Sequence, residues 1–454
     1  MNDRTLFHRD PLHGYPVVVR GEGVYLYDDE GHRFIDGTAG AGNVTLGHGR
    51  RRIAEVMAEQ ARTLAYSFSA LFANQPALDL AARIAAVAPV DDGRVYFVSG
   101  GSEGIETAFK LARQYHLLRG KGQKQKVIAR WRSYHGASLG ALAATGLPQL
   151  RAPFVPWLAD FPHIDPCYPY RCALEGCAGK CNLACARQLE KAILQAGPGN
   201  VAAFVAEPVV MGGVAAGVPP PEYFAQIRAI CDKYDVLFIV DEVITGFGRT
   251  GSYFAIEHWG VKPDVIVFGK GASSGYMPLG GVVMGGEIAS AFTAAGEFFQ
   301  HIFTYVNNPV AARVGLEVMD IIEEEEILTN ATKTGDYLQA KARELSEHPS
   351  VGDIRGLGLM LGIELVKDRE TGEPFPVGEK VSQRLCRMAL TRGLALSGAS
   401  GGADWVDGDD LRYYPPLVIS REEIDLSLAI IHQSLTQLEE ELGMTVTVGC
   451  RQPS

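Results

Sequence analysis

The chain has 454 residues, of which 47% are hydrophobic and 21% are charged. This length allows two or three lobes with large buried cores, and the composition excludes a disordered chain, a collagen and a coiled-coil rod. A formal net charge of -11 with no basic cluster argues against a nucleic-acid partner. The polar start and the absence of a long apolar stretch predict a cytoplasmic protein without a membrane segment.

The first recognisable elements predict a hairpin followed by an α/β domain. Residues 22–36, EGVYLYDDEGHRFID, alternate apolar and polar positions around a turn, which indicates a β-hairpin with one solvent face. From about Asp92 to Gly285, short β-branched runs alternate with helical stretches, which indicates a parallel sheet covered on both faces. The expected strands are RVYFVS, KVIAR, VAAFVAE, VLFIVDEV, DVIVFGK and GGVVM.

The C-terminal part is expected to form a smaller lobe together with the N-terminal hairpin. GLGLMLGIELV is predicted as one strand, and LRYYPPLVIS as the end of another. Ser420 and Glu423 match a capping box at the start of the last helix, whose apolar stripe begins at Ile424. The expected boundaries are 1–60 for the N-terminal part of the small lobe, 61–316 for the large domain and 317–454 for the C-terminal small domain.

Five of the eight cysteines lie in one segment at about 157–186, which is expected to be an insertion in the large domain. They are Cys167, Cys172, Cys177, Cys181 and Cys185. A structural zinc site is one interpretation, and Cys181 and Cys185 would share a face if helical. Because the gaps lack paired Cys-x-x-Cys knuckles, we expect a thiol-rich surface insertion and no metal.

Polar residues at strand ends are the candidates for chemistry, since ligands of open parallel sheets bind beyond the carboxyl ends of the strands. Gly101 and Ser102 follow RVYFVS and open a helix, where free N–H groups and the positive helix end favour a phosphate. An ordinary turn with Ser102 as N-cap is the alternative.

Three further strand ends carry Tyr134, Asp241 and Lys270. Tyr134 could stack on a flat ligand or pack in the core. Asp241 could bind a metal, orient a histidine, hold a proton on a ring nitrogen, or be a solvated strand end. A buried Lys270 would have a lowered pKa and could form an imine with an aldehyde, whereas a surface lysine is the alternative. One ligand, pyridoxal 5'-phosphate, matches all these strand ends. Its phosphate suits the helix start at Gly101 and Ser102, and its aldehyde, ring nitrogen and ring face suit the lysine, the carboxylate and the aromatic ring.

A nucleotide-binding function is the main rival. A P-loop is excluded because the sequence contains no G-x-x-x-x-G-K-[ST]. GFGRTG, from Gly246 to Gly251, matches the dinucleotide pattern and suggests an NAD-dependent oxidoreductase. Only a short stretch precedes Gly260 and Pro263, which leaves little room for the phosphate-binding helix that this pattern requires.

The sequence resembles the class III aminotransferases, the ω-aminotransferase branch of the fold type I pyridoxal-phosphate enzymes. The resemblance covers nearly the whole chain, and its motifs are GEGVYLYDDEGHRFIDGTAG, SGGSEGIETAFKLAR, YHG, AEP, DEVITGFGRTG, FGKGASSGYMPLGG, FTYVNNP, RGLGLMLGIEL and LRYYPPLVIS. It implies an α/β fold with a large, mostly parallel-sheet cofactor domain and a smaller α+β lobe made from both termini. GFGRTG then becomes a structural turn.

The resemblance also implies roles for individual residues around pyridoxal 5'-phosphate. Lys270 would form the imine with the cofactor and later carry the proton between substrate carbon and cofactor carbon. Asp241 would keep the pyridine nitrogen protonated, so that the ring acts as an electron sink. The remaining cofactor contacts would come from Gly101 and Ser102 to the phosphate, Tyr134 stacked on the ring, and Glu207 as a hydrogen-bonding neighbour.

Two more implied residues concern the subunit partner and the substrate. Thr304 would reach the phosphate of the neighbouring subunit, so that a homodimer shares its active sites. Arg412 would grip the substrate carboxylate, although a structural surface arginine is the alternative. Ornithine-type members carry an acidic partner for this arginine where this chain has Gly212, which argues against ornithine as donor and against 2-oxoglutarate as the favoured acceptor.

We therefore expect a pyridoxal-phosphate-dependent aminotransferase that moves an amino group from a primary amine or ω-amino acid to a 2-oxo acid such as pyruvate or 2-oxoglutarate. An aminomutase or a decarboxylating aminotransferase is the alternative on the same cofactor. The pocket is expected to be shaped by Tyr66, Phe68, Trp157 and Tyr276.

Overall fold

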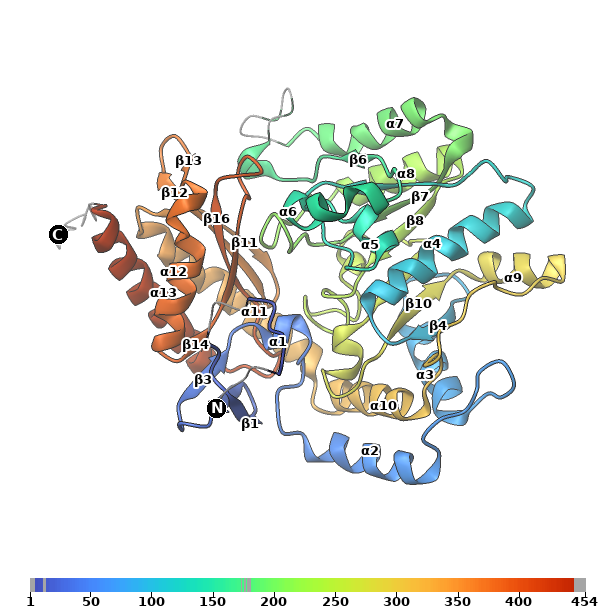
Figure 1. Ribbon diagram of the computed structural model, residues 1–454, viewed down its shortest axis with the longest axis horizontal. Helices are drawn as coiled ribbons and strands as arrows, with labels where there is room; N and C mark the ends of the chain where they lie inside the picture. The colour runs from blue at the N-terminus through green and yellow to red at the C-terminus, as the bar shows by residue number, and fades with distance from the viewer. Residues whose placement is uncertain (1–4, 11–13, 173, 175–176, 178–180, 445–454) are drawn as a thin grey trace.

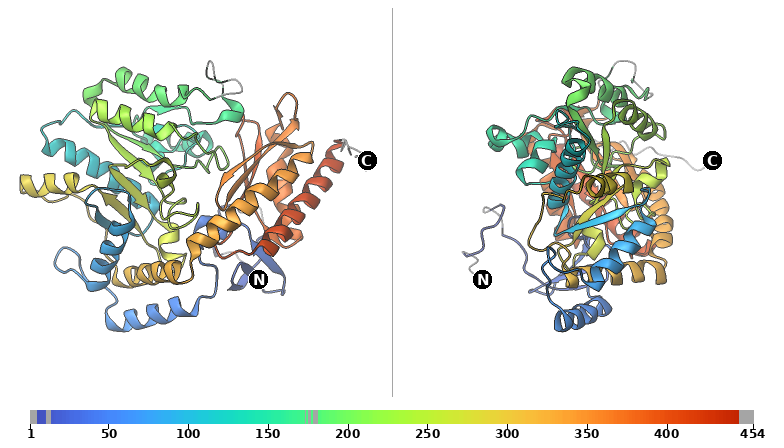
Figure 2. Two further views of the ribbon diagram at one scale, coloured as in Figure 1. Left: turned by 180° about the vertical axis from the view of Figure 1, so that it is seen from behind. Right: turned by 90° about the vertical axis from the view of Figure 1, so that its right-hand side faces the viewer.

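The protein consists of two lobes that lie side by side in the computed structural model (Figure 1). The structure describes residues 5–10, 14–172, 174, 177 and 181–444. Chain segments far apart in the sequence meet in the smaller lobe, where the first strands lie beside elements from the last quarter of the chain (Figures 1 and 2). Among the described residues, no helix is long and apolar enough to cross a membrane.

The larger lobe is built on a seven-stranded sheet in the order β4-β10-β9-β8-β7-β5-β6. All six predicted strands are present, and β10 alone runs antiparallel to its neighbours β4 and β9. The connection from β9 to β10 contains only a short 3-10 helix, and without a long crossover the chain cannot return in parallel. The strands are β4 (Arg94–Val98), β5 (Lys126–Arg130), β6 (His163–Ile164), β7 (Val201–Ala206), β8 (Leu237–Asp241), β9 (Val265–Phe268) and β10 (Gly280–Met284).

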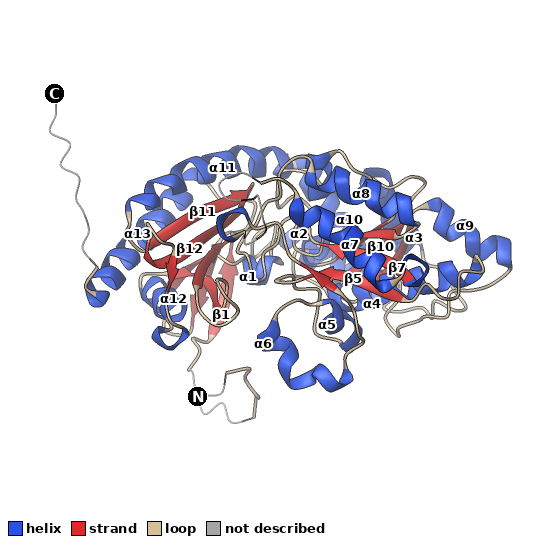
Figure 3. Cartoon of the chain, turned by 90° about the horizontal axis from the view of Figure 1, so that it is seen from above, coloured by secondary structure: helices blue, strands red, loops and turns tan. Residues whose placement is uncertain are grey.

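Helices cover both faces of this sheet (Figure 3), which matches the continuous apolar strands. Side chains alternate between two core layers: Phe204 and Phe238 pack on the side of α7 and α8, while Val205 and Ile239 pack on the side of α4. The helices between residues 39 and 324 are α1 (Ala39–Gly42), α2 (Arg51–Thr63), α3 (Gln75–Val87), α4 (Gly101–Leu118), α5 (Leu139–Ala144), α6 (Pro148–Arg151), α7 (Ala184–Ala196), α8 (Tyr223–Tyr234), α9 (Gly286–Ala295) and α10 (Pro309–Glu324).

The described residues of the smaller lobe form two sheets and three α-helices. The predicted hairpin is confirmed as β2 and β3, and β3 pairs in parallel with β14 from the C-terminal part. The elements are β1 (Val18–Glu22), β2 (Tyr25–Asp28), β3 (Arg33–Asp36), α11 (Ile327–Ala342), β11 (Val351–Leu357), β12 (Met360–Asp368), β13 (Glu373–Pro374), α12 (Val381–Thr391), β14 (Leu394–Ala395), β15 (Ser397–Ser400), β16 (Asp409–Tyr413) and α13 (Arg421–Leu442).

Short 3-10 helices connect many of these elements. They are η1 (Ala152–Trp157), η2 (Pro169–Arg171), η3 (Pro198–Asn200), η4 (Ala255–Trp259), η5 (Lys270–Ser273), η6 (Arg343–Glu347) and η7 (Val377–Glu379). The domain boundaries placed after residues 60 and 316 stay predictions, and both positions lie inside helices, α2 and α10.

Two C-terminal predictions have different outcomes. GLGLMLGIELV is not one strand, because the chain turns at Gly358, with φ +56°, and Leu357 pairs with Met360 across the antiparallel strands β11 and β12. The capping box of the last helix is confirmed. Ser420 Oγ accepts a bond from the Glu423 N–H at 3.2 Å, and Glu423 accepts one from the Ser420 N–H at 2.9 Å.

Candidate functional site

A cavity of about 1060 Å³ lies at the carboxyl ends of the central strands, where the two lobes meet. Its wall includes seven of the eight residues that were predicted to be catalytic or to bind the cofactor or substrate; the eighth, Thr304, lies elsewhere. The seven are Gly101, Ser102, Tyr134, Glu207, Asp241, Lys270 and Arg412. The small lobe closes the cavity with β15 and β16, from which Gly398 and Ala399 also line it.

The start of α4 forms one end of the cavity. Its first backbone N–H groups have no carbonyl partner within the helix, so this end can bind an anion. Only glycine fits at Gly101, because an added Cβ would lie 2.7 Å from Cγ1 of Val243. Ser102 is the second residue of the helix and not its N-cap, which is Gly100; its Oγ accepts a bond from the Ala137 N–H at 3.2 Å.

Asp241 is a buried carboxylate at the end of β8, and not a solvated strand end. Its Oδ2 lies 2.7 Å from Nδ1 of His135, and its Oδ1 accepts a bond from the Val243 N–H at 3.0 Å. Nε2 of His135 is buried without a hydrogen-bond partner. The pair therefore holds the carboxylate in one orientation at the cavity wall. Sequence analysis missed His135, although it follows Tyr134 at the same strand end.

Lys270 follows β9 and opens η5 with a left-handed backbone, φ +40°. Burial lowers the pKa of its amine, while the negative charges of Asp241 and Glu207 raise it. Nζ forms no hydrogen bond or ion pair with the part of the chain that the structure describes. Lys270 therefore presents an unengaged amine to the cavity that Asp241 also lines.

Tyr134 and Glu207 stand next to each other in the cavity wall. Tyr134 is 41% exposed and is therefore not a core residue. Its backbone N–H donates to Oε1 of Glu207 at 3.1 Å. Glu207 follows β7 directly and is buried, which raises the pKa of its carboxyl group. The bond fixes the backbone of Tyr134, whose side chain lines the cavity.

Arg412 lies on β16 and is engaged by a neighbouring acid. Its Nε donates to Oδ1 of Asp410 at 2.7 Å and its Nη2 donates to Oδ2 at 2.8 Å, and Nη2 also donates to the carbonyl of Gly212. Asp410 is the counter-charge that the family-based prediction did not find at Gly212. Residues two apart on a strand share a face, which is the signal that could have identified it.

Glu242, next to Asp241, points away from the cavity and supports the following turn. It accepts bonds from the Thr245 hydroxyl and from the Ile256 N–H, the latter at 2.8 Å. Burial raises the pKa of Glu242 to about 7. This carboxyl group is therefore structural, and its proton affects folding rather than the cavity.

The raised pKa predicts a pH-dependent stability. The folded state binds this proton more tightly than the unfolded state, so the contribution of Glu242 is complete below about pH 4.5 and is lost as the pH rises through about 7. Above pH 7 we expect Glu242→Gln to be more stable than the parent, with a free energy of unfolding larger by at most about 3 kcal/mol and a higher melting temperature. Near pH 4 the two proteins should melt at the same temperature. Thermal melts across this range test it, and a difference independent of pH would contradict it.

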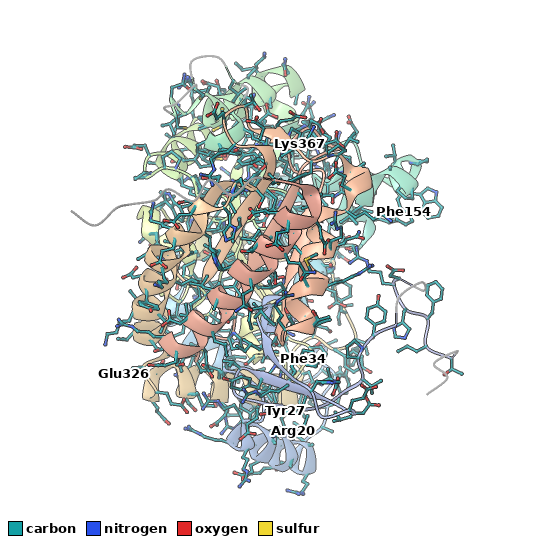
Figure 4. The ribbon with its side chains drawn as sticks, turned by 90° about the vertical axis from the view of Figure 1, so that its left-hand side faces the viewer. Arg20, Tyr27, Phe34, Phe154, Glu326 and Lys367 are labelled. Atoms are coloured by element: carbon teal, nitrogen blue, oxygen red, sulfur yellow. The ribbon has the colours of Figure 1, made fainter. Side chains whose placement is uncertain are left out.

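Thr304 and the side chains expected to shape the pocket lie elsewhere. Thr304 is exposed, and its carbonyl accepts a bond from the Tyr66 hydroxyl at 2.7 Å. Tyr66, Phe68, Trp157 and Tyr276 do not line the cavity of this chain, so the prediction for them is wrong for a single subunit. Apolar walls come instead from Leu142, Leu147, Phe154, Met211 and Met277. Phe154 stands at the outer edge of the molecule in Figure 4, which places it at the rim.

Comparison with known proteins assigns the chain to a family. The family model described as aminotransferase class-III matches residues 8–435. The chain belongs to the class III aminotransferases. Putrescine–pyruvate aminotransferase of Pseudomonas aeruginosa is 39% identical over 433 residues, covering 93% of this chain and 91% of that protein. Diaminobutyrate–2-oxoglutarate transaminase of Halomonas elongata is 36% identical over 447 residues, covering 96% of this chain and 93% of that protein.

The solved structures agree with this assignment. The ω-transaminase of Pseudomonas jessenii in complex with PMP superposes with a TM-score of 0.88 at 32% identity, covering 96% of this chain and 98% of that chain. Pyridoxal phosphate is the cofactor of this class III aminotransferase. The cavity fits this cofactor, because the free amine of Lys270, the buried carboxylate of Asp241 and the N-terminus of α4 all line it.

GFGRTG has no nucleotide-binding geometry in this class III aminotransferase. The Phe247 N–H donates to the Tyr253 carbonyl at 2.6 Å, which closes a turn, and the five-residue η4 follows instead of a long helix. Arg249 inside the turn is fully buried and donates to the Pro415 carbonyl. The segment therefore connects the large lobe to the chain that follows β16. Because it is not followed by a phosphate-binding helix, it does not support the dehydrogenase interpretation.

Proposed function

We propose that this aminotransferase moves an amino group from a primary amine or ω-amino acid to a 2-oxo acid such as pyruvate or 2-oxoglutarate. The observation that carries the proposal is the unengaged amine of Lys270 in the same cavity as the His135-bound carboxylate of Asp241. The names of the two relatives, putrescine–pyruvate and diaminobutyrate–2-oxoglutarate, support amines and both acceptors. We also propose a cytoplasmic location, because the described cysteines form no disulfides and the cytoplasm keeps thiols reduced.

Three residues carry the proton chemistry in this proposal. Pyridoxal phosphate, when bound, supplies an aldehyde that accepts amino groups and a ring that withdraws electrons from the substrate carbon. Lys270 would hold the cofactor through its amine and would move the proton at the substrate carbon. Burial lowers the pKa of this amine, which favours its neutral, nucleophilic form. Asp241 would keep the ring nitrogen protonated. His135 fixes the orientation of that carboxylate through its contact with Oδ2.

The other wall residues position the ligand. The N–H groups of Gly101 and Ser102 bind the phosphate at the positive end of α4. Tyr134 stacks on the ring face, and Glu207 sets the backbone from which Tyr134 projects. The apolar wall excludes water from the reacting bonds.

The test is a donor panel assayed against pyruvate and 2-oxoglutarate, with the cofactor absorbance recorded before and after each amine. Transfer to a 2-oxo acid, with a return of the aldehyde absorbance, supports the proposal. Carbon dioxide release, or migration of the amino group without a 2-oxo acid, would identify the decarboxylating or aminomutase alternative instead. Borohydride reduction must label the peptide FGKGASSG.

Gly101→Ala is expected to weaken cofactor binding about tenfold, because its Cβ would be forced against Val243 and α4 would shift away from the phosphate. Titration of the apoenzyme with pyridoxal phosphate measures the effect. Gly378→Ala is the matched control, since nothing lies within 4 Å of its added Cβ. Val243→Ala in the same chain should restore affinity, and failure to do so would refute the steric explanation.

We propose that Arg412 releases Asp410 and binds the carboxylate of the acceptor in its place. We expect Arg412→Gln to raise KM for the 2-oxo acid about 10- to 100-fold, because the carboxylate loses charged hydrogen bonds. KM for an amine donor that carries no carboxylate should not change. The double variant Arg412→Gln/Asp410→Asn keeps two hydrogen-bonding side chains and leaves no unpaired charge. An equally raised KM in the double variant supports the role, and an unchanged KM in both variants would contradict it.

We propose further that Thr304 acts across a homodimer interface, since in its own subunit it lies outside the cavity. Chains carrying Lys270→Ala and chains carrying Thr304→Asp are each expected to be inactive. Mixed dimers of the two should regain activity, because one of their sites then combines an intact lysine with an intact threonine. No recovery in mixed dimers, or a monomer by light scattering, would overturn this arrangement.

A further inference from the structure

The cysteine-rich insertion forms a thiol cluster outside the active-site cavity. The Sγ atoms of Cys167, Cys181 and Cys185 all lie within 4.8 Å of one another, and each residue is a free cysteine. Cys167 and Cys185 are buried, as is Cys177. These three thiols are therefore covered by the chain, while the prediction that the segment is a surface insertion stays a prediction.

The fold brings the three thiols together from two elements. Cys167 follows β6, while Cys181 precedes α7 and Cys185 is its second residue. β6 and α7 pack against each other in the large lobe (Figure 1). The Cys177 thiol donates to Oδ1 of Asn182 at 3.0 Å, and Cys172 and Cys177 interact electrostatically with each other and with Cys185. A further thiol is thus within reach of the three.

A buried positive charge beside the cluster points to a negative group there. Arg130, at the end of β5, is completely buried, and within the described part of the chain it forms no ion pair. Its Nη2 donates to the Glu207 carbonyl, whereas its Nε and Nη1 have no partner. The hydroxyl of Tyr223 is also unpartnered, and Arg130 and Tyr223 both interact electrostatically with Cys185. The Glu207 carboxyl group interacts electrostatically with Arg130 without forming an ion pair with it, so the free N–H groups of this buried guanidinium still lack a counter-charge in contact.

We propose that Cys167, Cys181 and Cys185 bind one Zn²⁺ as thiolates, with Cys172 or Cys177 supplying the fourth thiolate. Zinc prefers closed tetrahedral sulfur sites, in which ligand sulfurs lie about 3.8 Å apart, so the cluster needs to contract only slightly. Each ligand thiol releases its proton to solvent as its Zn–S bond forms, and no atom changes oxidation state. Four thiolates and Zn²⁺ carry two negative charges, which supply the missing partner for Arg130.

The site has a structural role, because none of these cysteines lines the active-site cavity. The residues that follow Cys167 connect the lobes: the Tyr168 hydroxyl donates to Glu364 on β12, and Arg171 Nε donates to Glu364 at 2.6 Å. Zinc would anchor the large-lobe end of this connection. Arg130 links the same site to the backbone of Glu207 in the cavity wall.

Elemental analysis of the holoenzyme, purified without chelators, tests the proposal. We expect one zinc per chain, and loss of zinc in Cys167→Ser, Cys181→Ser and Cys185→Ser. Cys386→Ser is the control that should keep zinc, since Cys386 lies on α12 of the small lobe. Loss of zinc in either Cys172→Ser or Cys177→Ser identifies the fourth ligand, and retention in both would refute the four-thiolate site.

A second measurement needs no variant and therefore does not depend on whether the variants fold. Wild-type enzyme refilled with Co²⁺ should show the intense thiolate-to-cobalt charge-transfer absorption of a tetrahedral sulfur site, and added Zn²⁺ should abolish it. Wild-type enzyme without stoichiometric zinc or this absorption would overturn the proposal. Iron with acid-labile sulfide, or a disulfide between Cys167 and Cys185 in the purified protein, would overturn it as well.

Discussion

Replacing Lys270 with alanine is expected to lower kcat by about 10⁴-fold, the upper range for removal of a group that transfers protons in the reaction. The variant also loses the only cofactor-facing amine that the described cavity wall contains. The measurement is a steady-state assay together with borohydride labelling, which should no longer mark FGKGASSG. Added methylamine should restore part of the activity by supplying a small base in the space of the missing side chain.

Lys262→Ala is the matched control for this substitution. Lys262 is an exposed lysine in the same chain segment, where it pairs with Asp91, and it should be dispensable for turnover. Full turnover by Lys270→Ala, or a borohydride label on any other lysine, would remove the basis of the proposed function.

Asp241→Asn is expected to lower kcat by about 10³-fold, because a neutral amide cannot keep the ring nitrogen protonated. The effect should appear in the cofactor spectrum and in the rate of proton removal from the donor carbon, whereas KM should change little. His135→Phe should produce a smaller loss of the same kind, since the carboxylate would then lose its 2.7 Å partner.

Glu242→Gln separates this effect from the removal of any buried acid. Glu242 is adjacent to Asp241 and equally buried, but it points toward Thr245 and Ile256. Its glutamine variant should keep kcat within a few-fold of the parent. Equal losses in Asp241→Asn and Glu242→Gln would indicate that both act only through folding.

The strand-end residues could be predicted from the sequence because their placement depends on local patterns. An apolar run that stops at Asp241, or a run that ends in Gly269 and Lys270, marks the edge of a parallel sheet where ligands bind. The shared edge then brings residues from distant sequence positions into one cavity. This rule needs no knowledge of loop conformation, and it accounts for Gly101, Ser102, Tyr134, Asp241 and Lys270 in the cavity wall, whereas Glu207 and Arg412 were predicted from the family resemblance.

The residues that escaped prediction depend on loops and on contacts between lobes. Tyr66 lies on an irregular segment and Trp157 ends the short 3-10 helix η1, and no periodic pattern in the sequence defines the direction of either side chain. Asp410 takes its role from pairing with Arg412 once β16 faces the cavity. The thiols of Cys167 and Cys185 meet only because β6 packs against α7. The thiol pair combines separate chain segments, which a single sequence without tertiary information does not specify, whereas Asp410 and Arg412 share one strand and could have been paired from their spacing.

The pairing of β3 with β14 has a consequence for biosynthesis. β3 ends at Asp36 and β14 begins at Leu394, so at about 5–20 residues per second the ribosome releases the N-terminal hairpin roughly 20–70 s before its partner strand exists. During that interval the edge of β3 is open to wrong pairing with other nascent chains. The smaller lobe can therefore be completed only after the segment that contains β14 has been synthesised, and chaperones that shield an early hairpin should raise the yield of active enzyme.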